Sequence, residues 1–88
     1  MMLSGRTIVV TGAARGVGRD IARACAKAGA RLVLGDILED AGRDVAKELA
    51  STTTARFVPI DLDNPKSIEA FGRDVSARES ELIQTTSS

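Results

Sequence analysis

The stretch that decides the fold is IVVTGAARGVGRDIARACAKAGA, residues 8–30, in which an apolar run gives way to glycines and then to a helical pattern. The glycines are Gly12, Gly16 and Gly18. Glycine loses more backbone freedom on folding than any other residue, so a cluster of glycines needs a reason. Directly after a strand, the cluster indicates that something approaches the backbone closely at this turn.

The whole chain alternates strand-like and helix-like segments. The predicted strands are Thr7 to Thr11, Arg31 to Gly35 and Ala55 to Ile60. A helical pattern follows each predicted strand, because apolar residues recur there at spacings of three and four and give each helix one buried face. The three faces are formed by Val17, Ile21, Ala22, Cys25 and Ala28, then by Leu38, Ala41, Val45 and Leu49, and then by Ile68, Phe71 and Val75. This order predicts an α/β fold with a parallel sheet and right-handed helical crossovers.

Composition and charge exclude several classes of protein. The 12 basic and 12 acidic residues cancel, so no electrostatic surface for nucleic acid or anionic lipid is expected. Without histidine and with one cysteine, the chain is a poor candidate for a transition-metal site and has no disulfide framework, which fits the cytoplasm. The first residues show neither the long apolar core nor the cleavage site of a signal peptide, so none is expected, and no apolar run approaches the roughly 20 residues that span a bilayer.

Three residues follow directly after the three predicted strands: Gly12, Asp36 and Asp61. The carboxyl ends of parallel strands lie at one edge of the sheet, where such folds bind their ligands. At the first of these turns, the opening N–H groups of the helix make an anion site. Gly12 permits the tight turn, Gly16 lets a pyrophosphate come close, and Gly18 lets helix and strand pack closely. Asp36 is placed to bond a ribose 2′-hydroxyl.

The string from Thr11 to Gly18, TGAARGVG, resembles the T-G-x-x-x-G-x-G motif of short-chain dehydrogenases/reductases. The resemblance runs from about Thr7 to Val75. It implies the three-strand N-terminal portion of a Rossmann-type, doubly wound fold, and hydride transfer between NAD(P) and an alcohol or ketone in a longer protein. The cofactor-binding residues that it implies are Gly12, Arg15, Gly16, Val17, Gly18, Asp36, Ile37, Asp61 and Leu62, the last two at the adenine ring.

Asp36 and Arg15 favour different cofactors. A carboxylate within about 4 Å of a 2′-phosphate is repelled by roughly 4 kcal/mol at an effective dielectric near 20. In the family that the motif resembles, members that prefer NADP often carry a basic residue at the position of Arg15, which can bind phosphate in a bidentate way. Arg15 can instead pair with Asp36 or lie against the adenine. We therefore expect NAD in preference to NADP.

Each candidate residue also has a structural explanation. The glycines can be turn residues without a ligand, and Asp36 can cap the second helix at its N-terminus. Asp61 can be a surface or capping carboxylate before the third helix, which Asp63 or Asn64 is expected to cap. Arg15 can be a solvated loop residue, and Cys25, on an apolar helix face, is expected to be a core side chain and not a nucleophile.

No catalytic residue is expected in this chain. The resemblance implies a catalytic Ser, Tyr and Lys beyond the third helix, and the sequence has no tyrosine. We expect a partial dinucleotide-binding domain over residues 1–75 and a polar, disordered tail over 76–88, in a chain that is truncated relative to the family. The first strand would then be a sheet edge open to self-association. A non-catalytic module that binds a dinucleotide or an adenylate is the alternative function.

Overall fold

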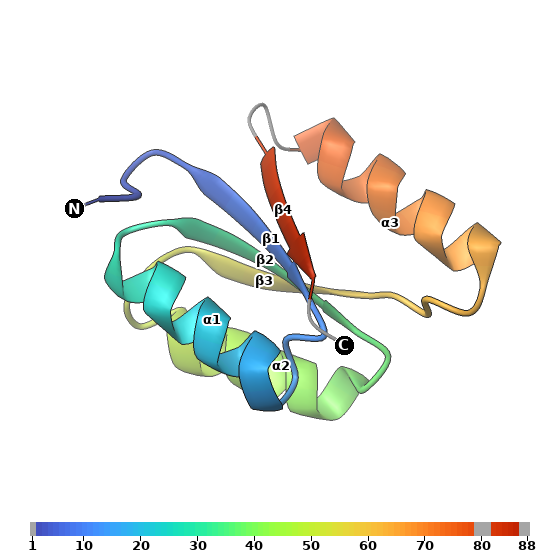
Figure 1. Cartoon of the computed structure of the whole chain (residues 1–88), viewed down its shortest axis with the longest axis horizontal. Helices are drawn as coiled ribbons and strands as arrows, with labels where there is room; N and C mark the ends of the chain where they lie inside the picture. Colours follow the sequence, from blue (N-terminus) through green and yellow to red (C-terminus); the bar gives the residue numbers. More distant parts are fainter. Residues whose placement is uncertain (1, 79–81, 87–88) are drawn as a thin grey trace.

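Figure 1 shows a computed structural model of the protein, which describes residues 2–78 and 82–86, with side chains up to residue 75. Its four strands form one parallel sheet in the order β3-β2-β1-β4. The strands are β1 (Thr7–Thr11), β2 (Arg31–Asp36), β3 (Ala55–Pro59) and β4 (Leu82–Thr86). The helices are α1 (Gly16–Lys27), α2 (Glu39–Leu49) and α3 (Pro65–Arg78). Helices α1 and α2 cover one face of the sheet, and α3 lies on the other (Figure 1).

The core has one apolar cluster on each face of the sheet, because successive side chains of a strand point to opposite faces. In β1, Ile8 and Val10 belong to the cluster that α1 and α2 cover, which also holds Leu32 and Leu34. Val9 belongs to the cluster on the other face, with Phe71 and Val75 of α3. All five residues of β1 are buried. Burial on both faces therefore holds this strand, and the start of the turn that follows it, in a defined position.

The predicted α/β class, the parallel sheet and the positions of the first three strands are confirmed. The prediction of a disordered tail from Ser76 was wrong in the part of the chain that is described. Helix α3 continues to Arg78, and Leu82–Thr86 pairs along its whole length with β1. The sheet consequently has four strands where three were predicted. Residues 79–81 and 87–88 lie outside the described residues.

The expectation that β1 is an open edge was also wrong. Its five residues pair with β2 on one side and with β4 on the other, from Thr7 opposite Leu82 to Thr11 opposite Thr86. The backbone groups of β1 are thus engaged on both sides, and the strand offers no edge to a second copy of the chain.

Two glycines let helices approach the sheet closely. A Cβ on Gly42 of α2 would collide with the ring of Phe57 in β3. A Cβ on Gly35 of β2 would lie 2.8 Å from Cε1 of Phe71 in α3. Gly35 immediately precedes Asp36, so the packing of α3 helps to set where this carboxylate emerges from the sheet.

Candidate functional site

The turn between β1 and α1 depends on glycine at two positions. Gly12 has φ 72° and Gly16 has φ 60°, in the left-handed region that favours glycine. A Cβ built on Gly16 meets no heavy atom within 4 Å, so the space in front of this residue is open. The residue before it, Arg15, takes the N-cap position of α1 in an extended conformation and makes no side-chain capping bond. The first N–H groups of α1 are therefore available to an acceptor from outside the chain.

Asp36 connects this turn to the rim, by which we mean the carboxyl edge of the sheet with the turns that follow β1, β2 and β3. Its Oδ2 accepts a hydrogen bond from the Ala14 N–H, and its Oδ1 accepts one from the Leu38 N–H, both at 3.0 Å. Its carbonyl oxygen accepts a 3.2 Å bond from the Ile60 N–H, and the neighbouring Gly35 carbonyl accepts one of the same length from the Ala13 N–H. Asp36 is thus fixed by both neighbouring strand ends.

The turn after β3 is held by a second set of local bonds. The Asp61 N–H donates to Ser67 Oγ at 2.8 Å, and Asp61 Oδ1 accepts from the Asp63 N–H at 3.0 Å. Asn64 accepts the Lys66 N–H at its side-chain Oδ1, also at 3.0 Å. Asn64 is therefore the N-cap of α3, as one of the two sequence alternatives predicted, and Asp61 stabilises the turn before it.

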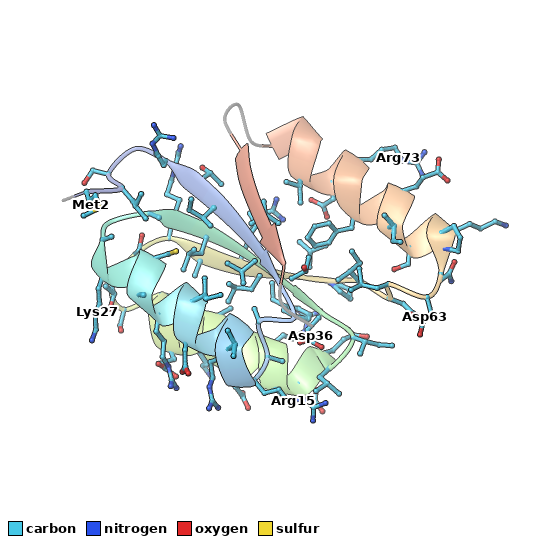
Figure 2. The ribbon with its side chains drawn as sticks, in the orientation of Figure 1. Met2, Arg15, Lys27, Asp36, Asp63 and Arg73 are labelled. Atoms are coloured by element: carbon cyan, nitrogen blue, oxygen red, sulfur yellow. The ribbon has the colours of Figure 1, made fainter. Side chains whose placement is uncertain are left out.

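These three strand ends enclose a cavity of about 170 Å³ at the carboxyl edge of the sheet. It is lined by Gly12, Asp36, Ile37, Ile60, Asp61, Leu62 and Asp63. A second cavity of about 220 Å³ adjoins it, shares three of these residues and extends to Glu39 and Ser67. Figure 2 shows Arg15, Asp36 and Asp63 towards this end of the molecule and Met2 and Lys27 towards the other.

The cavity combines acceptors with exposed apolar side chains. Ile37 is 62% exposed and Leu62 is 56% exposed, values that are high for large apolar residues. Both line the cavity beside the carboxylates of Asp36 and Asp61. A flat apolar ring with polar edges would cover these side chains and pair with the neighbouring acceptors. An adenine ring has that chemistry.

Most residues of the implied set meet at this edge. Gly12, Asp36, Ile37, Asp61 and Leu62 line the cavity. Their role in cofactor binding stays a prediction. Sequence reasoning did not include Ile60 and Asp63, which also line it. In the sequence, only their positions directly before and after the Asp61-Leu62 pair could have indicated them.

The remaining members of the set lie at the start of α1. Arg15, Gly16 and Val17 are exposed, whereas Gly18 is buried. The expectation that Val17 belongs to the inner face of this helix was wrong, because its side chain is 67% exposed. Gly18 and Ala22 are buried on that face. Val17 is therefore open to a ligand at the helix N-terminus.

The structure also bears on the alternative role of Asp36. The N-cap of α2 is Leu38 and not Asp36. Asp36 accepts the Leu38 N–H across a two-residue turn before the helix, so it organises the approach to α2 without capping it. The carboxylate therefore serves the local fold and lines the cavity at once.

Other kinds of site find no support in the described residues. No group of three or more metal-binding side chains occurs among them. Burial raises the pKa of the Cys25 thiol, which disfavours the nucleophilic thiolate. Within the same part of the chain, no helix has the length and apolar character that crossing a membrane requires.

A parallel sheet with a glycine turn, a helix N-terminus and a carboxylate at the end of the second strand is the architecture of Rossmann-type nucleotide-binding proteins. The family model described as short chain dehydrogenase matches residues 6–82. The chain therefore belongs to the short-chain dehydrogenase family.

Curated relatives agree with this family. The chain is 39% identical to human retinol dehydrogenase 11 over 85 residues, which cover 93% of the chain and 27% of that protein. It is 44% identical to the 3-alpha-(or 20-beta)-hydroxysteroid dehydrogenase of Mycobacterium bovis over 63 residues, which cover 72% of the chain and 24% of the relative. The chain spans about a quarter of the length of these relatives.

Solved structures agree as well. The Pseudomonas aeruginosa RhlG/NADP active-site complex superimposes with a TM-score of 0.90 at 28% identity, over 97% of this chain and 35% of that one. A metagenomic short-chain oxidoreductase in complex with NADP gives a TM-score of 0.83 at 38% identity, over 93% of this chain and 39% of that one. Both neighbours are NADP complexes, so binding of a nicotinamide dinucleotide is a property of structures closely similar to this fold.

Proposed function

We propose that the carboxyl edge of the sheet binds NAD as the cofactor-binding part of an oxidoreductase. The observation that carries the proposal is the convergence of the Gly12 turn, Asp36 and Asp61 on one cavity with exposed apolar side chains. The open N–H groups of α1 supply the anion site that a diphosphate needs. The cavity supplies carboxylate acceptors for the hydroxyls of a ribose and for a nucleobase.

Each part of the dinucleotide is assigned to a part of the rim. The diphosphate lies at the N-terminus of α1, in the open space before Gly16. The adenosine ribose meets Asp36, and the adenine lies against Ile37 and Leu62 with Asp61 at its edge. Ala14 donates its N–H to Asp36, so its amide holds the carboxylate and is not counted among the diphosphate donors.

The reaction proposed for the whole protein is hydride transfer between the nicotinamide, which carries the hydride when bound, and an alcohol or ketone. The described rim binds and orients the cofactor, and no residue of this chain is assigned a catalytic role. A non-catalytic module that binds a dinucleotide or an adenylate uses the same rim. Binding of a dinucleotide without turnover of NADH by a panel of ketones fits both functions, and failure to bind excludes both.

NAD is favoured over NADP by the charge around the cavity. Among the residues whose side chains are described, Asp36, Asp61 and Asp63 line it and no lysine or arginine does. A 2′-phosphate on the ribose would add negative charge beside Asp36, which costs free energy in a partly desolvated site. Arg15, the residue that favours NADP, is exposed at the start of α1, while the Asp36 oxygens are bound by backbone amides.

The proposal is tested by isothermal titration of the full chain with NAD, NADP and AMP. We expect NAD to bind more tightly than NADP, and AMP to bind more weakly than NAD because it lacks the diphosphate bridge and the nicotinamide half. Tighter binding of NADP would reverse the assignment of Asp36. If none of the three ligands binds, the proposed function is wrong.

Location and assembly belong to the proposal too. We assign the protein to the cytoplasm because a single cysteine cannot form an intramolecular disulfide, which fits a reducing compartment. Self-association through a sheet edge would use β3 or β4, the outer strands of the described sheet, since β1 is paired on both sides. Light scattering after size-exclusion chromatography measures the oligomeric state directly.

A further inference from the structure

Ser67, in the first turn of α3, holds the turn that carries Asp61. The Asp61 N–H donates a 2.8 Å hydrogen bond to Ser67 Oγ. Two further atoms of Asp61 are engaged: its carbonyl oxygen accepts the Asn64 N–H, and its Oδ1 accepts the Asp63 N–H, both at 3.0 Å. Oδ2 is then the carboxylate oxygen left for a ligand in the cavity.

The three bonds differ in what they connect. Asp63 and Asn64 belong to the same short turn as Asp61, so their bonds set its shape. Ser67 lies inside α3, whose Phe71 and Val75 are buried in the core. The Ser67 bond therefore ties the turn to a rigid element and sets where the turn sits relative to the sheet. Ser67 also lines the second cavity with Ile37 and Asp61.

We propose that Ser67 is a positioning residue that makes the rim selective for adenine. By fixing Asp61, it holds Oδ2 where the exocyclic amino group of adenine can donate to it. Hypoxanthine carries a carbonyl oxygen at that place, which cannot donate and which the carboxylate repels. The inference rests on the proposed binding of NAD, and it adds that α3 controls the discrimination between bases.

The test compares NAD with nicotinamide hypoxanthine dinucleotide, in which a carbonyl replaces the amino group at C6 and N1 carries a proton. Wild-type protein is expected to bind NAD about tenfold more tightly, and Ser67→Ala is expected to lower this ratio about fivefold, since one hydrogen bond is lost. Ser67→Thr keeps the hydroxyl and is expected to restore the ratio. Ser51→Ala is the matched control, because it removes a serine hydrogen bond at the far end of α2.

A general loss of stability would weaken both ligands together and leave their ratio unchanged, so an unchanged ratio in Ser67→Ala overturns the inference. Equal binding of both ligands by the wild type overturns it too. In both cases NAD still binds, so the proposed function is retained. If NAD does not bind at all, both the proposed function and this inference are wrong. Amide hydrogen exchange of the wild type adds a check that needs no variant: the Asp61 N–H is expected to exchange slowly, and fast exchange contradicts the bond to Ser67.

Discussion

The backbone N–H of Ala14 donates a 3.0 Å hydrogen bond to Oδ2 of Asp36, across 22 positions of sequence. This bond fastens the glycine turn to the end of the neighbouring strand. It also orients the Asp36 carboxylate before any ligand arrives, which reduces the ordering that binding must impose. The glycine turn and the Asp36 carboxylate, which sequence reasoning treated separately, are thus one hydrogen-bonded unit.

Removing the charge of Asp36 is expected to change the cofactor preference. Asp36→Asn keeps the shape of the side chain, removes its negative charge and gives up one of its two bonds from backbone N–H groups. NADP binding should strengthen by about tenfold, the effect of roughly 1.4 kcal/mol. NAD binding should weaken, because the amide is a poorer acceptor for ribose hydroxyls. Titration calorimetry with both cofactors measures the shift. Asp44→Asn, on the exposed side of α2, is the control that should leave both affinities unchanged.

Gly16→Ala tests whether a ligand occupies the space before α1. The substitution is expected to cost about 1–2 kcal/mol of stability, because φ at this position is positive. It is also expected to weaken NAD binding by about tenfold, because the new methyl group projects into the space assigned to the diphosphate.

Gly5→Ala is the matched control for that experiment. Gly5 also has positive φ and open space for a Cβ, but it precedes β1, at the opposite end of the sheet. Both variants should therefore unfold at similarly reduced urea concentrations, and only Gly16→Ala should lose affinity for NAD. Equal affinities in the two variants would show that nothing binds in front of Gly16.

Two helical glycines are expected to respond to alanine with opposite signs. Gly42→Ala should destabilise the protein by about 1–3 kcal/mol, although alanine favours helices, because its Cβ collides with Phe57. Gly72→Ala should stabilise it by about 1 kcal/mol, because nothing lies within 4 Å of the added Cβ. Urea unfolding measures both changes. A combined Gly42→Ala, Phe57→Leu variant should recover part of the loss if the ring causes it.

The bond between Arg23 and Glu48 predicts a pH effect on stability. Arg23 donates two 2.9 Å hydrogen bonds to the Glu48 carboxylate, and these bonds lower the pKa of Glu48 below its ordinary value of 4.5. The folded protein therefore favours the ionised carboxylate. The resulting stabilisation is present above pH 4.5 and is lost as the pH falls through the lower, folded-state pKa.

Urea unfolding of wild type and Glu48→Gln between about pH 6 and about pH 3 measures this effect. The wild type should be the more stable protein at the upper end, and the difference should shrink towards the acidic end. It should be small throughout, because both side chains are solvent-accessible. In an Arg23→Gln background the same substitution should have little pH-dependent effect. A constant difference across the range would mean that the ion pair contributes nothing to stability.

The sequence was informative wherever local chemistry decides the structure. The run of β-branched residues in β1 and the glycines after it predicted the first strand and its turn, because no other common residue adopts the backbone of Gly12 and Gly16 readily. The carboxylates after β2 and β3 could be placed at one edge from topology alone. The part of the fold that holds the cavity was therefore predictable.

The predictions failed where contacts between distant segments of the chain determine the structure. Leu82–Thr86, with only two apolar residues, has no pattern of its own and becomes a strand by pairing with β1. Val17 fitted the apolar spacing of α1, but its side chain is exposed, and the helix buries Gly18 and Ala22. The bond from Asp61 to Ser67 was equally invisible, since periodicity does not show which hydroxyl accepts an amide.

The pairing of β1 with β4 has a consequence for biosynthesis. A nascent chain leaves the ribosome with β1 first, and β2 and β3 follow soon enough to join it on one side. The other side of β1 can be completed only after Leu82–Thr86 has emerged. Until then, a strand as apolar as Ile8-Val9-Val10 keeps a row of backbone amides and carbonyls without strand partners. Chaperone capture of ribosome-bound chains should therefore fall once β4 is out of the exit tunnel.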